Sequence, residues 1–245
     1  IAAYSAPKNI RCEILVPQAT SPAKLVQILS YGATLRKIPG SREDTAAAAL
    51  KRAESLYYAS HSWNPYFFQG TKTIAFEIWE DLECRVPDTL ILPVGNGTLF
   101  LGAYLGFKEL QESGITNKIP RLIGIQTAQC APLYATLQGQ SFQPIQSESN
   151  LAEGIAIARP IRGSEILKAT KETNGAIFAV NEAEIKEALK LMCSKGFFIE
   201  PTCAATIAGI KIALETHSNL GTIVSATSGH GLKSATKIGH LLNLL

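Results

Sequence analysis

Short apolar segments alternate with helical segments along this chain, and no other feature of the sequence constrains its fold as strongly. Each apolar segment has the length and composition of a strand that is buried on both faces of a parallel sheet. The clearest intervening helix is expected over residues 181–196, where Asn181 and Glu184 form a capping box and Gly196 ends the pattern. This alternation predicts an α/β fold with parallel sheets covered by helices on both faces. The expected strands lie in the segments RCEILVP, ATLRKIPG, TLILPV, RLIGIQTA, GAIFAV, FFIEP and GTIVSAT.

The length of the chain bounds the number of its domains. Its 245 residues, 46% of them hydrophobic, can bury a core as one large domain or as a large and a small one. The segment SWNPYFFQGTK, residues 62–72, is where the chain is expected to pass from one to the other. The sequence therefore predicts a small α/β domain over residues 1–60 and a large α/β domain over residues 61–245.

Charge and cysteine content exclude several classes of partner. The net charge of +3 is spread along the chain without a run of basic and aromatic residues, so we expect no nucleic acid and no membrane surface as partner. No apolar run approaches the roughly 20 residues of a membrane span, and no signal peptide is visible, so a cytoplasmic location is expected. The five cysteines show neither a C-x-x-C pair nor a zinc-ligand spacing, which predicts buried, reduced thiols and no metal. The expected partner is a small molecule.

The segment LILPVGNGTLFLGAYLGF, residues 90–107, carries the strongest signal for a binding site. A strand is expected to end at Val94 and a helix to begin near Thr98, so free amides and a helix N-terminus converge on the turn Gly95-Asn96-Gly97. The glycines are expected to let a phosphate approach the backbone, and Thr98 can add a hydroxyl. The third glycine of a dinucleotide fingerprint is not in place, which favours a mononucleotide-like phosphate over NAD. The alternative is a tight turn that binds nothing.

Five segments of the chain belong together: VPQATSPAKLVQILSYGATLRKIPG, NPYFFQGTKTIAFEIWEDL, PDTLILPVGNGTLFLGAYLGFKEL, FFIEPTCAATIAGI and SATSGHGLK. In this order they resemble segments of pyridoxal-phosphate enzymes of the tryptophan synthase β fold (fold type II), the threonine synthases in particular. The resemblance implies a small and a large domain, pyridoxal 5'-phosphate as cofactor, an amino acid as the small-molecule substrate, and a homodimer. It also implies that Gly95, Asn96, Gly97 and Thr98 hold the cofactor phosphate and that the Ser228 hydroxyl meets the pyridine nitrogen.

The implied contact of Ser228 bears on the chemistry. A neutral hydroxyl cannot hold the ring nitrogen protonated as an aspartate would, so the ring is a weaker electron sink. Elimination and replacement at Cβ or Cγ suit such a site better than transamination. The alternative for Ser228 is a solvated loop serine. His230 is expected to pack in the same loop, and Cys203 stands where the family usually has serine.

The chain departs from the family's pattern at its beginning. The family binds the cofactor aldehyde on a lysine near the N-terminus and closes on the substrate with a Ser-Gly-Asn loop, and neither is found in this sequence. The chain starts at IAAYSAPKNIRC without a methionine. We therefore expect that it lacks an N-terminal portion, that its small domain is incomplete, and that the Schiff-base lysine is not in this chain. Lys72 matches a different family lysine and is expected near the substrate; the alternative is a solvated or carbonyl-bonded lysine.

Residues at two positions leave the identity of the amino-acid substrate undecided. Threonine synthases often have arginines where this chain has Thr34 and Phe67, so charge-assisted contacts to a substrate phosphate are lost. Asn64 remains as a substrate contact, and Arg36 and Arg42 lie close enough in sequence to substitute. The favoured interpretation is a lyase for a β- or γ-substituted amino acid, threonine synthase-like, which converts O-phospho-L-homoserine to L-threonine. The alternatives are a threonine or serine dehydratase-like deaminase and a non-catalytic relative or fragment that binds pyridoxal phosphate or phosphate.

Overall fold

The computed structural model describes residues 1–20, 22–40, 42–143 and 150–244. The chain forms two compact units, Ile1–Asn64 and Pro65–Leu245, and each is described here by itself. The sequence prediction divides the chain after residue 60, within the same connecting segment.

Unit 1 is a parallel pair of strands with helices. β1 (Glu13–Pro17) pairs with β2 (Thr34–Ile38) in the register Glu13↔Thr34, and α2 (Pro22–Ser30) makes the crossover between them. Glu13 binds Arg36 at 2.8 Å and Arg52 at 3.0 Å, and the hydrogen bond from Arg52 is the largest cause of its lowered pKa. The remaining elements are α1 (Ala2–Ser5), η1 (Ala6–Lys8) and α3 (Arg42–Arg52).

Unit 2 contains a four-stranded parallel sheet with the strand order β5-β4-β3-β6. The central strands are β3 (Thr89–Pro93), which is buried along its whole length, and β4 (Arg121–Thr127). They are flanked by β5 (Ala176–Val180) and β6 (Ile223–Ser225). All pairings are parallel. The α/β prediction with parallel sheets is therefore confirmed.

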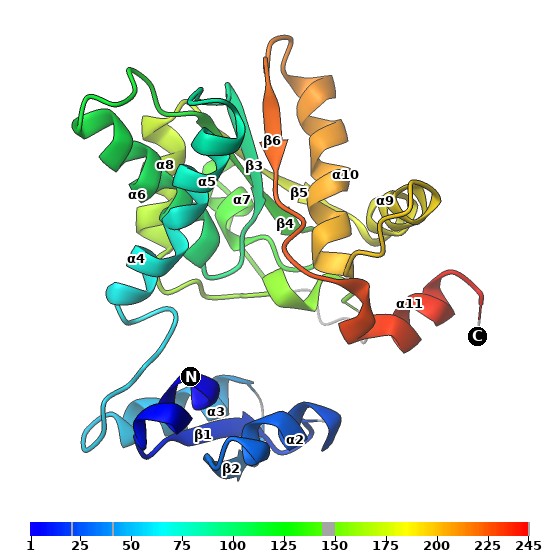
Figure 1. Ribbon diagram of the computed structural model, residues 1–245. Coiled ribbons are helices and arrows are strands. Elements are labelled where there is room, and N and C mark those ends of the chain that lie inside the picture. The colour runs from blue at the N-terminus through cyan, green and yellow to red at the C-terminus, as the bar shows by residue number, and fades with distance from the viewer. Residues whose placement is uncertain (21, 41, 144–149, 245) are drawn as a thin grey trace. The chain divides into compact units, whose positions relative to one another are not determined.

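Helices cover both faces of this sheet (Figure 1). Side chains alternate along β3, so that Leu90 and Leu92 join the apolar cluster under one helical layer and Ile91 joins the cluster under the other. The first layer contains α4 (Tyr66–Thr71), α5 (Thr73–Asp81), α6 (Thr98–Glu112) and α8 (Gly163–Glu172); the second contains α9 (Glu182–Ser194) and α10 (Pro201–Thr216).

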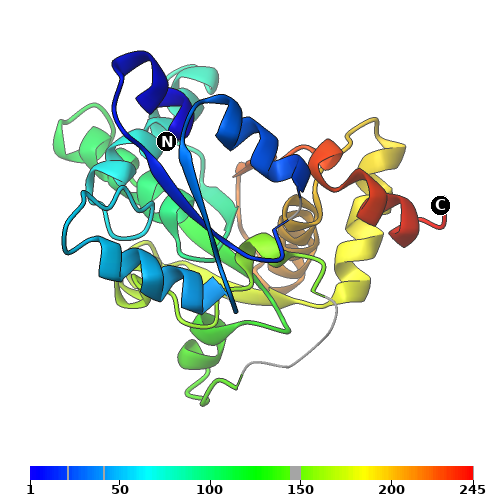
Figure 2. The ribbon, with the colours of Figure 1, turned by 90° about the horizontal axis from the view of Figure 1, so that it is seen from below.

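The C-terminal helix α11 (Ala235–Leu241) lies against the layer of α9 and α10. Ile238 of α11 is buried in the same cluster as residues of both helices, and Figure 2 shows α11 in red beside α9 in yellow. The remaining short helices of unit 2 are α7 (Pro132–Leu137), η2 (Glu153–Ile155) and η3 (Gly231–Ser234).

One expected strand is absent and one expected helix is confirmed. The segment FFIEP forms only a single bridge, Ile199↔His230, before α10 begins at Pro201. Proline favours the first turn of a helix, so α10 begins at the end of this apolar run, and a single bridge, at the buried Ile199, forms before it. In α9 the expected capping box is present, since Glu184 N–H donates to Asn181 at 3.0 Å and Asn181 N–H donates to Glu184 at 2.7 Å.

The described residues contain neither a membrane-spanning helix nor a metal-binding cluster. None of their helices combines the length and the hydropathy that crossing a membrane requires. They also contain no group of three or more His, Cys, Asp and Glu side chains placed to hold a metal ion. All five cysteines are free thiols, and Cys84 is exposed, unlike the buried thiols that the sequence suggested.

Candidate functional site

The turn Gly95–Thr98 lies at the carboxyl end of β3. Val94 N–H still donates to the Ile125 carbonyl of β4 at 2.8 Å, after which the chain leaves the sheet. Gly97 caps α6 with a positive φ of 78°, and the helix begins at Thr98 as expected. The carboxyl edge is where open parallel sheets bind their ligands.

The amides of this turn are available to a ligand. Among the described residues, no acceptor is found for the amides of Gly95, Asn96, Gly97 and Thr98, and no side chain caps α6. The first amides of a helix have no intrahelical partner and carry partial positive charge. The turn therefore has the chemistry of an anion site, in which backbone N–H groups and a helix N-terminus act together.

The glycines of the turn are also required by packing. A Cβ atom at Gly97 would lie 2.4 Å from Cδ1 of Ile166 in α8, and one at Gly95 would lie 3.2 Å from the Gly154 carbonyl oxygen. In both cases the space beside the glycine is filled by protein. The glycines therefore allow neighbouring segments to pack against the turn, and their expected role toward a phosphate stays a prediction.

Ser228 follows β6, the strand that pairs with β3 in the register Thr89↔Ile223. The turn and Ser228 thus lie beyond the carboxyl ends of adjacent parallel strands, and Ser228 is exposed. Behind it, the buried Cys203 thiol donates to the Ala226 carbonyl at 3.7 Å. Burial raises the pKa of Cys203, and hydrogen bonds from Gly229 and Ser228 oppose this shift. Cys203 therefore stays a thiol that contacts the Ser228 loop.

The Ser228 loop is joined to the segment that leads into α10. Glu200 N–H donates to the Gly229 carbonyl at 3.0 Å, and Gly231 N–H donates to the Phe198 carbonyl at 2.8 Å. A Cβ at Gly229 would lie 2.0 Å from the Glu200 carboxyl carbon. His230 accepts from Leu232 N–H at 3.2 Å, which agrees with the expected packing role.

The two expected substrate residues have partners elsewhere. Lys72 lies between α4 and α5, and its ammonium binds Glu109 of α6 at 2.5 Å. Glu109 is about 16 Å along the helix axis from Thr98 at 1.5 Å per residue. Asn64 closes unit 1 and donates to the Tyr57 hydroxyl at 2.5 Å. Their substrate roles stay predictions, and for Lys72 the role requires the ion pair to open.

Of the two arginines proposed as substitutes, the structure describes the side chain of one. The Arg36 guanidinium is paired with Glu13 inside unit 1. The side chain of Arg42 lies outside the described residues.

Two residues with contacts near the turn were not predicted from the sequence. The buried Gln126 donates to the Val94 carbonyl at 3.4 Å and accepts from the amides of Leu133 at 3.0 Å and Tyr134 at 3.1 Å. One amide group thus joins the last residue before the turn to the first turn of α7. A glutamine within an apolar strand, as in RLIGIQTA, is the signal that could have indicated it.

The second is Arg162, which precedes α8. Its guanidinium lies 4.7 Å from the ring centroid of Phe68, and it binds Glu165 at 2.8 Å. Phe68 is one turn before Thr71, whose hydroxyl donates to the Thr98 carbonyl at 3.0 Å. A cation therefore lies beside the helix that contacts Thr98, although Phe67 stands where threonine synthases often have an arginine.

Comparison with known proteins decides the family. The family model described as "Pyridoxal-phosphate dependent enzyme" matches residues 1–229. The chain belongs to this family. Its predicted fold type II architecture and its pyridoxal phosphate cofactor are thereby supported, together with the parallel α/β structure.

Relatives within the family include threonine synthases. The threonine synthase of Methanocaldococcus jannaschii is 36% identical over 240 residues, which are 95% of this chain and 59% of that protein. The threonine synthase of a Synechocystis species is 34% identical, over 95% of this chain and 60% of its own length. The chain thus spans about three-fifths of these relatives.

Solved structures share the fold. An L-serine ammonia-lyase from Rhizomucor miehei superposes with a TM-score of 0.77 at 21% identity, covering 99% of this chain and 77% of that chain. A serine racemase from Dictyostelium discoideum superposes with a TM-score of 0.72 at 24% identity, covering 94% and 71%.

The described residues have the chemistry that two parts of the family cofactor need, its phosphate and its pyridine nitrogen. The amides of the turn are donors without acceptors, as a phosphate requires, and they lie at the carboxyl edge of the sheet. The neutral hydroxyl of Ser228 follows the adjacent strand β6. A hydroxyl can donate a hydrogen bond to a pyridine nitrogen.

Proposed function

We propose that this family member acts as a pyridoxal phosphate-dependent carbon–oxygen lyase on a β- or γ-substituted amino acid, most simply on O-phospho-L-homoserine to give L-threonine. The observation that carries the proposal is the turn Gly95–Thr98, whose amides have no acceptor among the described residues, at the end of β3, while Ser228 follows the adjacent parallel strand β6. The 36% identity with a threonine synthase supports the choice of reaction.

In this proposal each residue of the chain has a defined task. The amides of residues 95–98 bind the cofactor phosphate, and the Thr98 hydroxyl adds a hydrogen bond. The Ser228 hydroxyl orients the ring through its nitrogen without placing a full charge there. When bound, pyridoxal phosphate supplies an electron sink for a bond broken at the amino acid. A neutral partner at the nitrogen limits that sink and favours elimination and replacement over transamination.

A deaminase that acts on threonine or serine is the second candidate. The observation that favours it is Phe67, an uncharged side chain where threonine synthases often have an arginine. Arg162 beside Phe68 favours the phosphorylated substrate, because a guanidinium can bind phosphate through two parallel hydrogen bonds. A non-catalytic relative that binds the cofactor remains the third candidate.

The test uses the full-length gene product. After pyridoxal phosphate is added, an absorbance spectrum reports binding, and products are then analysed with O-phosphohomoserine, threonine and serine. Threonine and inorganic phosphate from O-phosphohomoserine would support the proposal. Ammonia and a 2-oxo acid from threonine or serine would favour the deaminase, and a bound cofactor without products would indicate the non-catalytic relative. A spectrum without cofactor binding would contradict the proposal.

Arg162→Gln separates the first two candidates further. We expect it to raise KM for O-phosphohomoserine about tenfold, because one charge-assisted contact to phosphate is lost, and to change KM for serine little. Arg85→Gln, which removes an exposed guanidinium paired with Glu83, is the control. Equal effects on both substrates would contradict a phosphate contact for Arg162.

The assembly and location belong to the same proposal. We propose a homodimer in the cytoplasm, in keeping with the expectation from the family. Light scattering of the purified full-length protein measures its oligomeric state. Fractionation of cells that express it measures its location.

A further inference from the structure

A segment far from the turn in sequence covers Gly95. A Cβ at Gly95 would lie 3.1 Å from Cγ1 of Ile157 and 3.2 Å from both the Gly154 oxygen and Cα of Ile155. On its other side, a Cβ at Gly154 would lie 2.8 Å from the Thr202 hydroxyl of α10. Residues 150–157 are here called the covering segment, and the turn Gly95–Thr98 is called the phosphate turn. Gly154, Ile155 and Ile157 of the covering segment lie directly against Gly95 of that turn. A shift of this segment would change the packing against Gly95.

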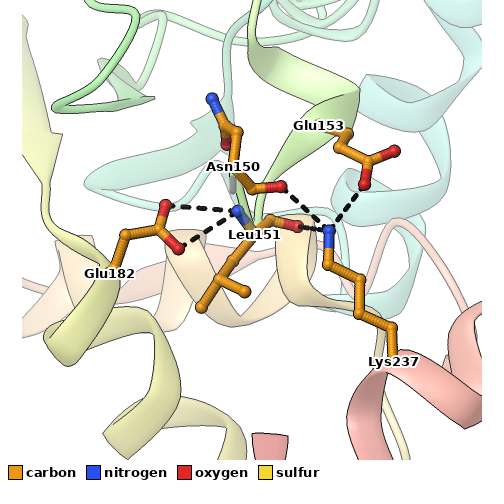
Figure 3. A network of polar contacts seen from close by, with 5 residues as sticks. All are labelled: Asn150, Leu151, Glu153, Glu182 and Lys237. Carbon is orange, nitrogen blue, oxygen red and sulfur yellow. Dashed lines mark hydrogen bonds and ion pairs between the residues drawn. The ribbon is translucent and has the colours of Figure 1, made fainter. Parts of the chain in front are cut away.

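Lys237 of α11 holds the first half of the covering segment. Its ammonium donates to the carbonyl oxygens of Asn150 at 2.9 Å and Leu151 at 3.4 Å, and to the Glu153 carboxylate at 2.6 Å (Figure 3). An ammonium has three donors, and here each has an acceptor. Two of these acceptors are main-chain carbonyls, so the lysine fixes the backbone of the segment rather than one of its side chains.

Glu182 holds the same segment from the opposite side. Leu151 N–H donates to both carboxylate oxygens of Glu182, at 3.2 and 3.1 Å, and Figure 3 shows Glu182 and Lys237 on opposite sides of Leu151. Burial raises the pKa of Glu182, while the Leu151 amide and the Lys237 charge lower it. The segment is thus bound to the first turn of α9 and to α11 together.

The helix that carries Lys237 is itself fixed. Ile238 is 1% exposed and lies in the apolar cluster that also contains Leu151, Ala152 and Ile155. The same chain runs from Ser228 through η3 into α11. Lys237 therefore connects the loop that follows β6 to the segment that covers the turn after β3.

We propose that Lys237 is a positioning residue for the cofactor site: it keeps the covering segment on Gly95 and so couples the phosphate turn to the Ser228 loop. The inference rests on the proposed function for the identity of the ligand. Lys237 touches neither the turn nor Ser228 in this role, and it acts through residues 150–157.

The test compares Lys237→Met, Lys237→Arg and the control Lys190→Met in the full-length protein. Lys190 makes an exposed pair with Glu187 within α9, so its loss is expected to leave binding unchanged. We expect Lys237→Met to bind pyridoxal phosphate about tenfold more weakly, because charge-assisted bonds to the segment are lost. Lys237→Arg, which keeps the charge, should recover part of the affinity.

Amide hydrogen exchange supplies a readout that a general loss of stability would not reproduce. Lys237→Met should accelerate exchange at residues 151–157 and 95–101 while α5 and α8 exchange as in the wild type. Unchanged affinity in Lys237→Met, or faster exchange throughout unit 2, would overturn the inference. A wild-type protein that does not bind pyridoxal phosphate would instead overturn the proposed function.

A milder variant keeps the test open if Lys237→Met does not fold. Glu153→Gln removes one charged acceptor and leaves both carbonyl bonds of Lys237 in place. It should weaken binding in the same direction and by a smaller factor. Affinity equal to the wild type in a folded Glu153→Gln variant would then count against the role of the contact.

Discussion

At the scale of single residues, Gly97 shows how packing and backbone conformation act at one position. Its φ of 78° is in the region that favours glycine, and Ile166 fills the space where a Cβ would be. These two constraints can be separated, because Gly114 has a similar φ of 72° with nothing within 4 Å of its Cβ position.

We expect Gly97→Ala to destabilise the protein more than Gly114→Ala. The shared cost of a left-handed alanine is about 1–2 kcal/mol, and crowding against Ile166 adds about 1–3 kcal/mol. Urea unfolding measures both. In an Ile166→Ala background the difference between the two variants should shrink, since Cδ1 and Cγ1 of Ile166 are the atoms in the way and alanine has neither. Equal losses for both variants would show that crowding at Ile166 contributes nothing.

Ser228 gives a second prediction at this scale, and its subject is turnover. Ser228→Ala should bind pyridoxal phosphate almost as well as the wild type, because the phosphate contacts are intact. Its kcat should be lower by a factor of about ten or more. Ser228→Asp should favour side reactions by holding a proton on the ring nitrogen. Cofactor titration and product analysis measure these effects. A large loss of affinity in Ser228→Ala would contradict the separate roles of turn and serine.

At the scale of elements, the short strand β6 depends on Asp88. The Asp88 carboxylate accepts from Lys118 at 2.6 Å and from Thr222 N–H at 2.9 Å, next to the residue where β6 begins. These two bonds lower its pKa below the ordinary value of 3.8, in that order of size. The folded state therefore prefers the ionised carboxylate more strongly than the unfolded state does.

This preference predicts a pH dependence of stability. The contribution of Asp88 is fully present above pH 3.8 and is lost as the pH falls through the lowered value, because protonation removes the charged acceptor. Asp88→Asn should thus lower Tm at pH 6, and the difference from the wild type should narrow toward pH 3. Asp81→Asn, at the exposed end of α5, is the control. A difference that is constant over this range would contradict the prediction.

Sequence patterns predict elements where one local rule is sufficient. An apolar run predicts the strand TLILPV. Residues typical of helix ends predict the capping box of α9 and the start of α6 at Thr98. The strand expected in FFIEP was wrong, because apolar residues followed by proline also occur before a helix. The contacts of Gln126, Arg162 and Lys237 join residues far apart in sequence, and no local pattern contains them.

The same limit applies to the candidate site. The turn could be placed from its glycines, but the reason for those glycines could not, since Ile166 and Gly154 become its neighbours only in the folded chain. Lys72 was expected near the substrate from its segment alone. Its partner Glu109 was not visible, because it depends on the packing of α5 on α6.

At the scale of the whole molecule, the two units differ in the core that each contains. Both large apolar clusters consist of residues of unit 2, from Phe68 onward. The buried apolar residues described in unit 1 are Ala2, Leu25 and Ala33. Burial of apolar surface is the main favourable contribution to folding, so the units should differ in independent stability.

We expect a fragment of residues 65–245 to unfold cooperatively on its own and a fragment of residues 1–64 to show no cooperative transition. Circular dichroism during urea titration measures both. The isolated 65–245 fragment should also keep slow amide exchange in β3 and β4, the central strands of its sheet. A non-cooperative 65–245 fragment would show that its core needs the rest of the chain.

The pairing of β3 with β6 sets the order in which the site can be completed during synthesis. The Ser225 hydroxyl donates to the Ile91 carbonyl, and these two residues are separated by 134 positions. Contacts between such distant positions form late, because a long loop must close first. A nascent chain therefore contains residues 95–98, the proposed phosphate site, well before the serine that would face the ring. It cannot hold both ends of a cofactor until β6 has emerged from the ribosome and joined the sheet.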